Sequence, residues 1–213
     1  MTDAPAPTPE DEVRPVTVLF ADIVGSTALG ERLAPDEVKA LVGECVTMMS
    51  RAVEEYGGMV QAYEGDGICA YFGVPAAHED DPERAARAGL RILEVVTEYA
   101  REVEAAWDLS GISVRVGINT GQAAVGQVGA ASPGTVALGD TTNAAARLQG
   151  LAEPGTMLAG EATARRLQHR FVFEPLGDLQ VKGREAKVSA SRLVGAKARE
   201  PVAGTTPLVG RDA

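Results

Sequence analysis

Two aspartates that end or join apolar segments are the residues of this sequence best suited to hold divalent metal ions. Asp22 follows the apolar stretch 16–21, and Asp66 stands between two glycines. Mg²⁺ and Mn²⁺ prefer oxygen ligands of this kind. Two such ions can stabilise both the attacking and the leaving oxygen of a phosphoryl displacement. Asp22 and Asp66 therefore predict a two-metal site, although either residue alone is equally well explained as a cap or a turn residue.

The segment after Asp22 has the composition of a phosphate-binding turn. Gly25, Ser26 and Thr27 lie between a predicted strand and the start of a helix. Glycine permits close backbone approach, and successive N–H groups at such a place can bind a triphosphate. The alternative is an ordinary helix cap made by Ser26 or Thr27.

An Asn/Arg pair provides a third chemical feature. Asn143 and Arg147 are four residues apart, so both side chains project from one face of a predicted helix. Ala144, Ala145 and Leu148 form a separate packing face. This leaves Asn143 and Arg147 free for an interface, unless they only form a solvated helix surface.

The elements that must position these residues alternate between strands and helices. Pro35 and Pro82 open two long helices, the first ending at 57–58 and the second capped by Asp81. A third helix carries Asn143. Apolar and β-branched runs predict strands, of which 59–63 and 68–74 form a hairpin with Asp66 at its tip and 112–118 pairs with 123–128. The strands are 16–21, 59–63, 68–74, 112–118, 123–128, 136–138, 157–159, 171–179 and 188–194. This βαββαβ order with C-terminal additions predicts a ferredoxin-like α+β sandwich.

Length and composition indicate one domain with two tails. The chain has 213 residues, of which 45% are hydrophobic, enough for one full core. Residues 1–14 are rich in Pro, Ala, Asp and Glu and predict a disordered lead-in. Residues 15–195 form the predicted domain, and residues 196–213 a flexible tail or linker to a further C-terminal domain.

Charge and cysteine usage limit the partners and the compartment. A net charge of −10 argues against a nucleic-acid partner, which requires a basic surface, and implies that a polyphosphate arrives with cations or meets local Lys and Arg. Cys45 and Cys69 fall on apolar faces, so we expect buried thiols and a reducing cytoplasm. No apolar run approaches the roughly 20 residues that span a bilayer. We therefore expect a cytoplasmic protein without a membrane partner.

These motifs together closely resemble the catalytic domain of class III nucleotidyl cyclases, the adenylate and guanylate cyclase homology domain. The resemblance covers about residues 15–195. Its parts are the first metal motif at 20–27, the second at 65–66, the transition-state helix at 139–148 and the late lysine motif at 181–183. The resemblance implies a ferredoxin-like core that forms a head-to-tail homodimer with active sites at the interface.

The resemblance also implies a reaction and a role for each residue. The reaction converts ATP to 3′,5′-cyclic AMP and pyrophosphate, with two Mg²⁺ or Mn²⁺ ions held by Asp22, Asp66 and the carbonyl of Ile23. The partner protomer supplies Asn143, which orients the ribose, and Arg147, which stabilises charge on the α-phosphate. Lys182 of that protomer binds the terminal phosphates, although an exposed loop lysine is the simpler explanation of that residue.

The two positions that read the base depart from the family pattern. Ala62 stands where family members usually place an adenine-reading lysine, and Val136 stands where adenylate cyclases usually have Asp or Thr. The acid and the cysteine typical of guanylate cyclases are absent there too. Neither side chain can hydrogen-bond a base, and apolar contact discriminates only roughly 10–200-fold, so we expect weak base selectivity. Glu64 shares strand parity with Ala62 and is a candidate substitute.

Two other function classes are alternatives. The main one is a catalytically weak or inactive cyclase-like module that binds nucleotide or dimerises to regulate an attached domain. Residues 206–212 resemble the start of the P-loop ATPase domains that follow cyclase domains in some bacterial regulators, which makes such a domain a candidate partner. A diguanylate cyclase is disfavoured because the sequence lacks the Gly-Gly-Asp/Glu-Glu-Phe turn.

Overall fold

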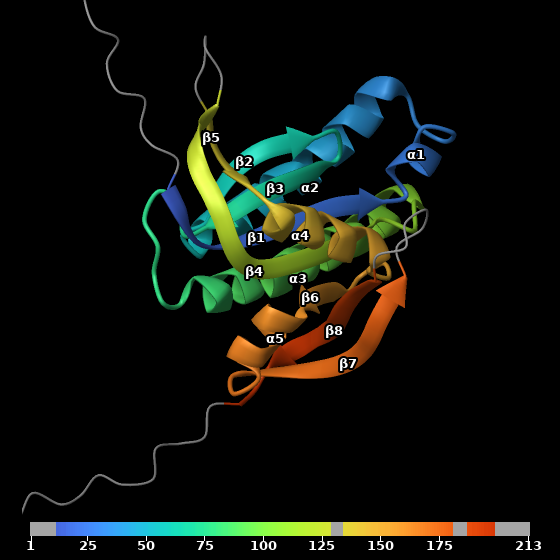
Figure 1. The fold of residues 1–213 in the computed structure, drawn as a ribbon. Helices are drawn as coiled ribbons and strands as arrows, with labels where there is room; N and C mark the ends of the chain where they lie inside the picture. Colours follow the sequence, from blue (N-terminus) through green and yellow to red (C-terminus); the bar gives the residue numbers. More distant parts are fainter. Residues whose placement is uncertain (1–11, 129–133, 181–186, 199–213) are drawn as a thin grey trace, which may run out of the picture.

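The computed structural model describes residues 12–128, 134–180 and 187–198, and its centre is one mixed β-sheet. The strands follow the order β2-β3-β1-β4-β6-β8-β7, and β5 pairs with β4 (Figure 1). The strands are β1 (Glu12–Val24), β2 (Met59–Glu64), β3 (Gly67–Phe72), β4 (Ser113–Val128), β5 (Gly134–Leu138), β6 (Met157–Gly160), β7 (Phe171–Gln180) and β8 (Lys187–Ala196). The helices are α1 (Ser26–Leu29), α2 (Pro35–Glu55), α3 (Asp81–Trp107), α4 (Asp140–Leu151) and α5 (Glu161–Leu167). The predicted α+β class with a βαββαβ core is confirmed.

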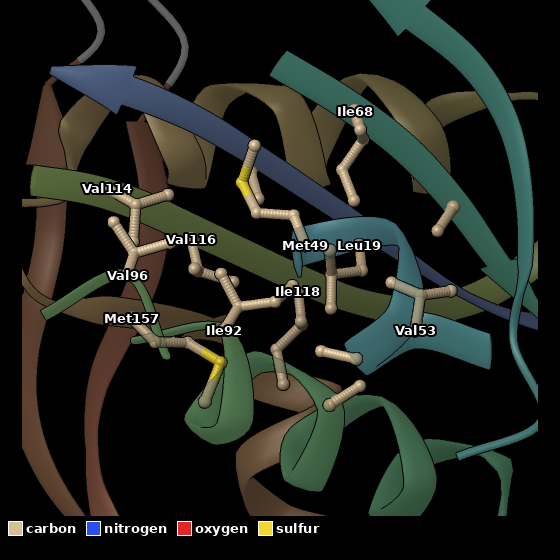
Figure 2. Close-up of a cluster of buried hydrophobic side chains, with 14 of the residues drawn as sticks. Leu19, Met49, Val53, Ile68, Ile92, Val96, Val114, Val116, Ile118 and Met157 are labelled. Atoms are coloured by element: carbon tan, nitrogen blue, oxygen red, sulfur yellow. The ribbon is translucent and has the colours of Figure 1, made fainter. Parts of the chain in front are cut away.

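The main hydrophobic core lies between the sheet and the helices α2 and α3. Alternate residues of β1, namely Leu19, Ala21 and Ile23, point into this core. The two helices are amphipathic, and they bury one apolar stripe each against the strands (Figure 2). Contributors from the sheet and the helices include Met49, Val53, Ile68, Ile92, Val96, Val114, Val116, Ile118 and Met157. This packing fixes β1 and β3, and with them the end of β1 and the turn that precedes β3.

The opposite face of the sheet carries α4, which is the only helix on that face among the described residues (Figure 1). Two glycines of β4 allow it to approach closely. A Cβ atom at Gly117 would lie 2.2 Å from the main-chain nitrogen of Gln149, and one at Gly121 would lie 2.5 Å from the Thr141 hydroxyl. The helix backbone excludes a side chain at Gly117, and the Thr141 side chain leaves no room for one at Gly121.

Glycine 121 also explains where the sequence-based strand assignment was wrong. The segments 112–118 and 123–128 were expected to be two paired strands, but they belong to one strand, β4. The polar, glycine-containing link 119–122 suggests a turn in the sequence. In the structure this link remains extended, pairs with β1 and accepts α4 on its surface.

Several element boundaries also differ from expectation, among them the starts of β1 and α3. Strand β1 begins at Glu12, inside the segment expected to be a lead-in. The N-cap of α3 is Asp80 rather than Asp81. Asp81 is buried, and its carboxylate accepts a hydrogen bond of 2.6 Å from the main-chain N–H of His78.

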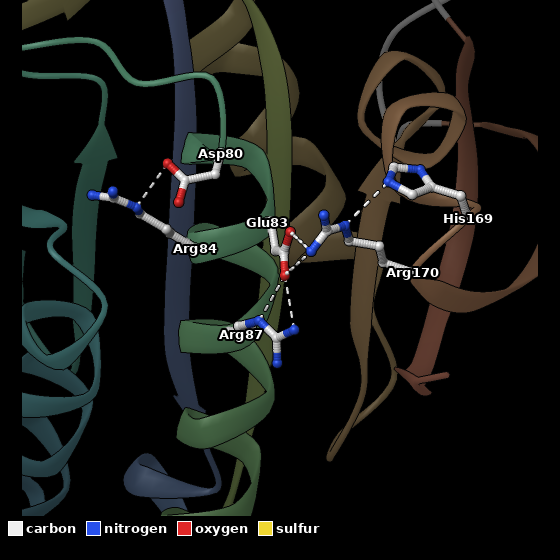
Figure 3. Close-up of polar contacts among 6 residues, drawn as sticks. All are labelled: Asp80, Glu83, Arg84, Arg87, His169 and Arg170. Atoms are coloured by element: carbon white, nitrogen blue, oxygen red, sulfur yellow. Dashed lines mark hydrogen bonds and ion pairs between the residues drawn. The ribbon is translucent and has the colours of Figure 1, made fainter. Parts of the chain in front are cut away.

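An ion-pair cluster joins α3 to the beginning of β7. The Glu83 carboxylate accepts hydrogen bonds from Arg87, one turn along α3, and from Arg170, which follows α5 (Figure 3). The Arg87 guanidinium also lies 5.6 Å from the centre of the Phe171 ring. Exposed ion pairs individually contribute little to the free energy of unfolding. We therefore infer that this cluster mainly aligns α3 with the β7–β8 hairpin.

Two composition-based expectations can be compared with the structure directly. Cys45 and Cys69 are both buried and unpaired, as predicted. None of the helices in the described part of the chain combines the length and apolar content needed to cross a bilayer.

Candidate active site

The structure brings Asp22 and Asp66 together at one end of the sheet. Asp22 lies near the end of β1, and Asp66 lies in the tight turn between β2 and β3. Strands β1 and β3 pair so that Asp22 stands opposite Gly67. The main-chain N–H of Ile23 donates a 3.3 Å hydrogen bond to the carbonyl of Asp66. The turn is thereby attached to the end of β1, as the two-metal hypothesis requires.

Gly67 makes this close arrangement possible. A Cβ atom at this position would lie 2.8 Å from the carbonyl oxygen of Ala21 and 2.9 Å from Oδ1 of Asp22. Both distances are shorter than normal contacts with carbon, so a side chain here would displace the Asp22 carboxylate. The absence of a side chain at Gly67 therefore leaves space for the Asp22 carboxylate.

The two carboxylates influence each other electrostatically. Burial raises the pKa of Asp22 to about 6, and the hydrogen bond and negative charge of Asp66 act in the same direction. The positive charge of Arg115 opposes this rise in the pKa of Asp22. Two adjacent carboxylates resist ionising together, and a divalent cation between them removes that penalty.

The donor set fits a hard divalent cation. In the described part of the chain, no group of three or more His, Cys, Asp or Glu side chains gathers as a metal site. The protein thus offers two carboxylates and nearby main-chain carbonyls such as that of Ile23. Mg²⁺ is commonly held by one or two carboxylates together with substrate phosphates, so two acids are sufficient for an ion that arrives with a nucleotide.

The predicted phosphate-binding turn lies directly beside the acidic pair. Gly25 has φ of 89°, and a Cβ atom there would lie 3.0 Å from the carbonyl oxygen of Gly111, which accounts for glycine. Helix α1 starts at Ser26, whose hydroxyl donates a hydrogen bond to Oδ2 of Asp66. Thr27 belongs to α1, and its side chain lies outside the described structure. A triphosphate cradle at residues 25–27 stays a prediction.

Arg115 is a candidate site residue that the sequence analysis missed. It stands opposite Asp22 in the β1–β4 pairing, so both side chains lie on the same face of the sheet. Its Nε atom is buried without a hydrogen-bond partner in the described structure. Arg115 as a whole is half-buried, and an arginine beside a carboxylate pair can also pair with an anion. The Val-Arg-Val alternation of β4 was the available signal, but it identifies the face of Arg115 only once the register with β1 is known.

Asn143 and Arg147 lie on α4 as predicted, but their face of the helix points away from the sheet. Ala145 and Leu148 are buried against the strands, whereas Asn143 is exposed and Arg147 half-buried on the opposite side of the helix. Asn143 and Arg147 therefore face away from the core, toward solvent or a partner.

The position of α4 along the sheet also separates Asn143 from the acidic pair. Thr141 lies against Gly121, which pairs with Val16. At the ordinary rise of a strand, the part of β1 from Val16 to Asp22 spans roughly 20 Å. Within one chain, Asn143 is thus remote from the two carboxylates and faces away from them.

The predicted base-reading positions lie in a largely apolar region. Ala62 pairs with Cys69 and packs, half-buried, against a cluster that includes Tyr71 and Ala137. Val136 belongs to β5, which lies against β2, but its side chain is outside the described structure. Glu64 is exposed, and its charge raises the pKa of Asp22, so it lies toward the acidic pair. Lys182 falls outside the described residues.

Comparison with known proteins gives consistent matches. The family model "Adenylate and Guanylate cyclase catalytic domain" matches residues 8–193. Adenylate cyclase 1 of Rhizobium meliloti (strain 1021) is 33% identical over 183 residues, which are 84% of this chain and 27% of that protein. A membrane guanylyl cyclase of Dictyostelium discoideum is 28% identical over 174 residues, 82% of this chain and 11% of that protein. The chain thus spans about a quarter or less of the length of these relatives.

Solved structures show the same fold. The adenylyl cyclase CyaB from P. aeruginosa superimposes with a TM-score of 0.83 at 27% identity, over 88% of this chain and 97% of that one. The guanylyl cyclase Cya2 superimposes with a TM-score of 0.81 at 26% identity, over 88% and 95% of the two chains. The match over most of the sequence and the shared architecture show that this chain belongs to the adenylate and guanylate cyclase catalytic domain family, the class III nucleotidyl cyclases.

Proposed function

We propose that this domain is a metal-dependent cyclase that converts ATP to 3′,5′-cyclic AMP and pyrophosphate at the interface of a homodimer. The observation that carries the proposal is the convergence of Asp22 and Asp66, from separate strands, on one point at the end of β1. Two divalent cations bound there would acidify the ribose 3′-hydroxyl and neutralise charge on the leaving pyrophosphate.

The phosphate chain of the substrate would extend from the acidic pair over the neighbouring donors. Arg115, a half-buried residue, offers its guanidinium beside Asp22, and residues 25–27 offer main-chain N–H groups. Arginine suits phosphate oxygens because its donors have a fixed planar geometry. These groups offset the local negative charge that would otherwise repel a triphosphate.

A second copy of the chain supplies the remaining residues in this proposal. Asn143 and Arg147 face outward from α4, and Asn143 is remote from the carboxylates of its own chain. The face of the sheet that carries Asp22 also presents the partly exposed apolar residues Phe20, Met59 and Ala62. A head-to-tail partner would cover this apolar surface and place its own Asn143, Arg147 and Lys182 over the phosphates. Asn143 would then orient the ribose, and Arg147 would stabilise charge that grows on the α-phosphate.

Adenine is proposed only as the commonest bacterial substrate of the family. The relatives include proteins named as adenylate cyclases and proteins named as guanylyl cyclases. Ala62 offers the base no side-chain hydrogen bond. We therefore expect measurable turnover of GTP as well as ATP. The kcat/KM values for the two nucleotides should differ by at most roughly 200-fold.

The test is turnover of the purified protein with ATP, GTP, CTP and UTP in Mn²⁺, with each 3′,5′-cyclic product measured by mass spectrometry. Asp66→Ala is the control. We expect cyclic AMP from the wild type and none above background from the control. Product that persists in Asp66→Ala would contradict the assigned site.

The apolar surroundings of Ala62 favour one second candidate, a cyclase-like module that binds nucleotide or dimerises without efficient catalysis. Loose placement of the base would displace the reacting atoms, and small displacements are costly in rate. Absence of product from all four nucleotides, at concentrations where light scattering shows dimers, would support this candidate over the enzyme.

A further inference from the structure

The side chain of Asp66 stands on a turn that restrains it weakly. Gly65, with φ of 65°, precedes Asp66 and Gly67 follows it, so neither neighbour has a side chain that could hold the carboxylate. The main chain of the turn is fixed to β1 by the hydrogen bond from Ile23 to the Asp66 carbonyl. That bond does not fix the rotation of the carboxylate.

Ser26 provides the missing restraint. Its hydroxyl donates a hydrogen bond to Oδ2 of Asp66, across a separation of 40 residues in the sequence. Ser26 is itself held in place, because it begins α1, where the N–H of Leu29 donates to the carbonyl of Gly25. The contact is partly buried, so water competes with it less than at an open surface.

We propose that Ser26 is a positioning residue for the metal site: its hydroxyl fixes the orientation of the Asp66 carboxylate for a divalent cation. A hydroxyl donated to one oxygen leaves the other oxygen of Asp66 to face the cation in a defined direction. Hydrogen bonds of this kind to ligating carboxylates typically change metal affinity by about 10–100-fold. The inference rests on the metal site of the proposed function.

This role differs from the phosphate-binding role that the sequence predicts for Ser26. With its hydroxyl engaged by Asp66, Ser26 can serve a triphosphate through its main-chain N–H only. Loss of the hydroxyl should then weaken binding of the cation even when no nucleotide is present.

The experiment measures binding of Mn²⁺ alone, by calorimetric titration or by the electron paramagnetic resonance of free Mn²⁺. The variants are Ser26→Ala, Ser26→Thr, Ser26→Cys and Asp66→Asn. Ser50→Ala is the matched control, because it removes a partly buried serine hydroxyl that donates to the Val46 carbonyl within α2. Circular dichroism melting establishes that each variant is folded.

We expect Ser26→Ala to weaken Mn²⁺ binding about 10–100-fold, while Ser26→Thr stays within a few-fold of the wild type. Ser26→Cys keeps the volume with a weaker donor and should be weakened as well, which keeps the test decisive if the alanine variant is unstable. Ser50→Ala should bind as the wild type does. Two results would overturn this inference while leaving the proposed function intact. One is equal Mn²⁺ affinity of Ser26→Ala and the wild type, and the other is a loss of affinity in Ser26→Thr as large as that in Ser26→Ala.

The same titration separates this failure from failure of the proposed function. Wild-type binding that Asp66→Asn abolishes supports the metal site on which both statements depend. If the wild type shows no Mn²⁺ binding that depends on Asp66, either alone or together with a non-hydrolysable ATP analogue, the metal site and the role of Ser26 are both wrong.

Discussion

The acidic end of β1 and the junction of β2 with β5 lie on the same face of the sheet, but they are built differently. At the end of β1, Asp66 is bound by Ser26 and Ile23, and Gly67 leaves space for Asp22. At the junction, Ala62 packs against apolar residues and offers no polar group. Under the proposed function, the groups for phosphoryl chemistry would thus be held closely and the base loosely, and the two requirements would be separable in this fold.

The largest expected effect comes from removing one carboxylate. Asp66→Asn should lower kcat by roughly a thousandfold, since metal ions supply several kcal/mol of transition-state stabilisation. Initial rates with Mn²⁺ and ATP measure it. Asp178→Asn, on the exposed surface of β7, is the matched control and should keep full activity. A fall of less than tenfold in Asp66→Asn would mean that the acidic end does not hold the metal.

The tight geometry of the acidic end can be tested by adding a single methyl group. Gly67→Ala should lower the free energy of unfolding by about 1–3 kcal/mol and reduce activity, because the new Cβ meets Ala21 and Asp22. In contrast, Gly43→Ala on the exposed side of α2 meets no atom within 4 Å and should stabilise the fold by about 0.5–1 kcal/mol. Urea denaturation measures both. Similar effects of the two substitutions would refute the close-approach argument.

The loose junction should be improvable. Ala62→Lys restores the lysine that the family usually carries, and its stem can lie along the apolar surface around Cys69. One added hydrogen bond to the base should raise the ratio of ATP to GTP turnover by about tenfold. The ratio of kcat/KM for the two nucleotides tests this. An unchanged ratio would show that Ala62 is not at the base.

The smallest expected effect is a pH dependence of stability in the metal-free protein. The pKa of Asp22 is about 6 in the folded chain against an ordinary value of 3.8, because of burial and the neighbouring Asp66. Between these pH values the folded state binds more protons than the unfolded state, so the free energy of unfolding falls as pH rises from about 4 to 6.

Melting temperatures of the wild type and Asp22→Asn, compared across that range, isolate the contribution of this carboxyl. The melting temperature of the wild type relative to that of Asp22→Asn should decrease toward pH 6 and then level off. A difference between the two proteins that is independent of pH would contradict the raised pKa. Mn²⁺ should raise the melting temperature of the wild type above pH 6, since the cation favours the ionised pair of carboxylates.

The sequence predicted most of the elements that position the site, because their patterns are local. The apolar stretch before Asp22 and the glycines around Asp66 are sufficient to identify a strand end and a turn. Helix α4 was identifiable from the spacing of Ala145, Leu148 and the polar pair. Each of these signals lies within about ten residues.

The remaining features depend on contacts between distant segments. The link 119–122 resembles a turn until α4 is seen to require Gly121, and α5 is too short for a periodic pattern. Arg115 in an alternating strand resembles a solvent-facing residue until the register places it beside Asp22. The hydrogen bond between Ser26 and Asp66 joins positions 40 residues apart. Patterns within a short stretch of sequence do not reveal contacts between residues so far apart.

The central claim is that one active site needs two copies of the chain, and mixing two inactive variants tests it most directly. Asp22→Ala removes the acidic half of a site, and Asn143→Ala removes the half presented by α4. Random pairing in an equimolar mixture makes half of the dimers mixed, each with one intact site, so about a quarter of wild-type cyclase activity should return. No recovery, in a mixture whose dimers are confirmed by light scattering, would contradict a site shared between two chains.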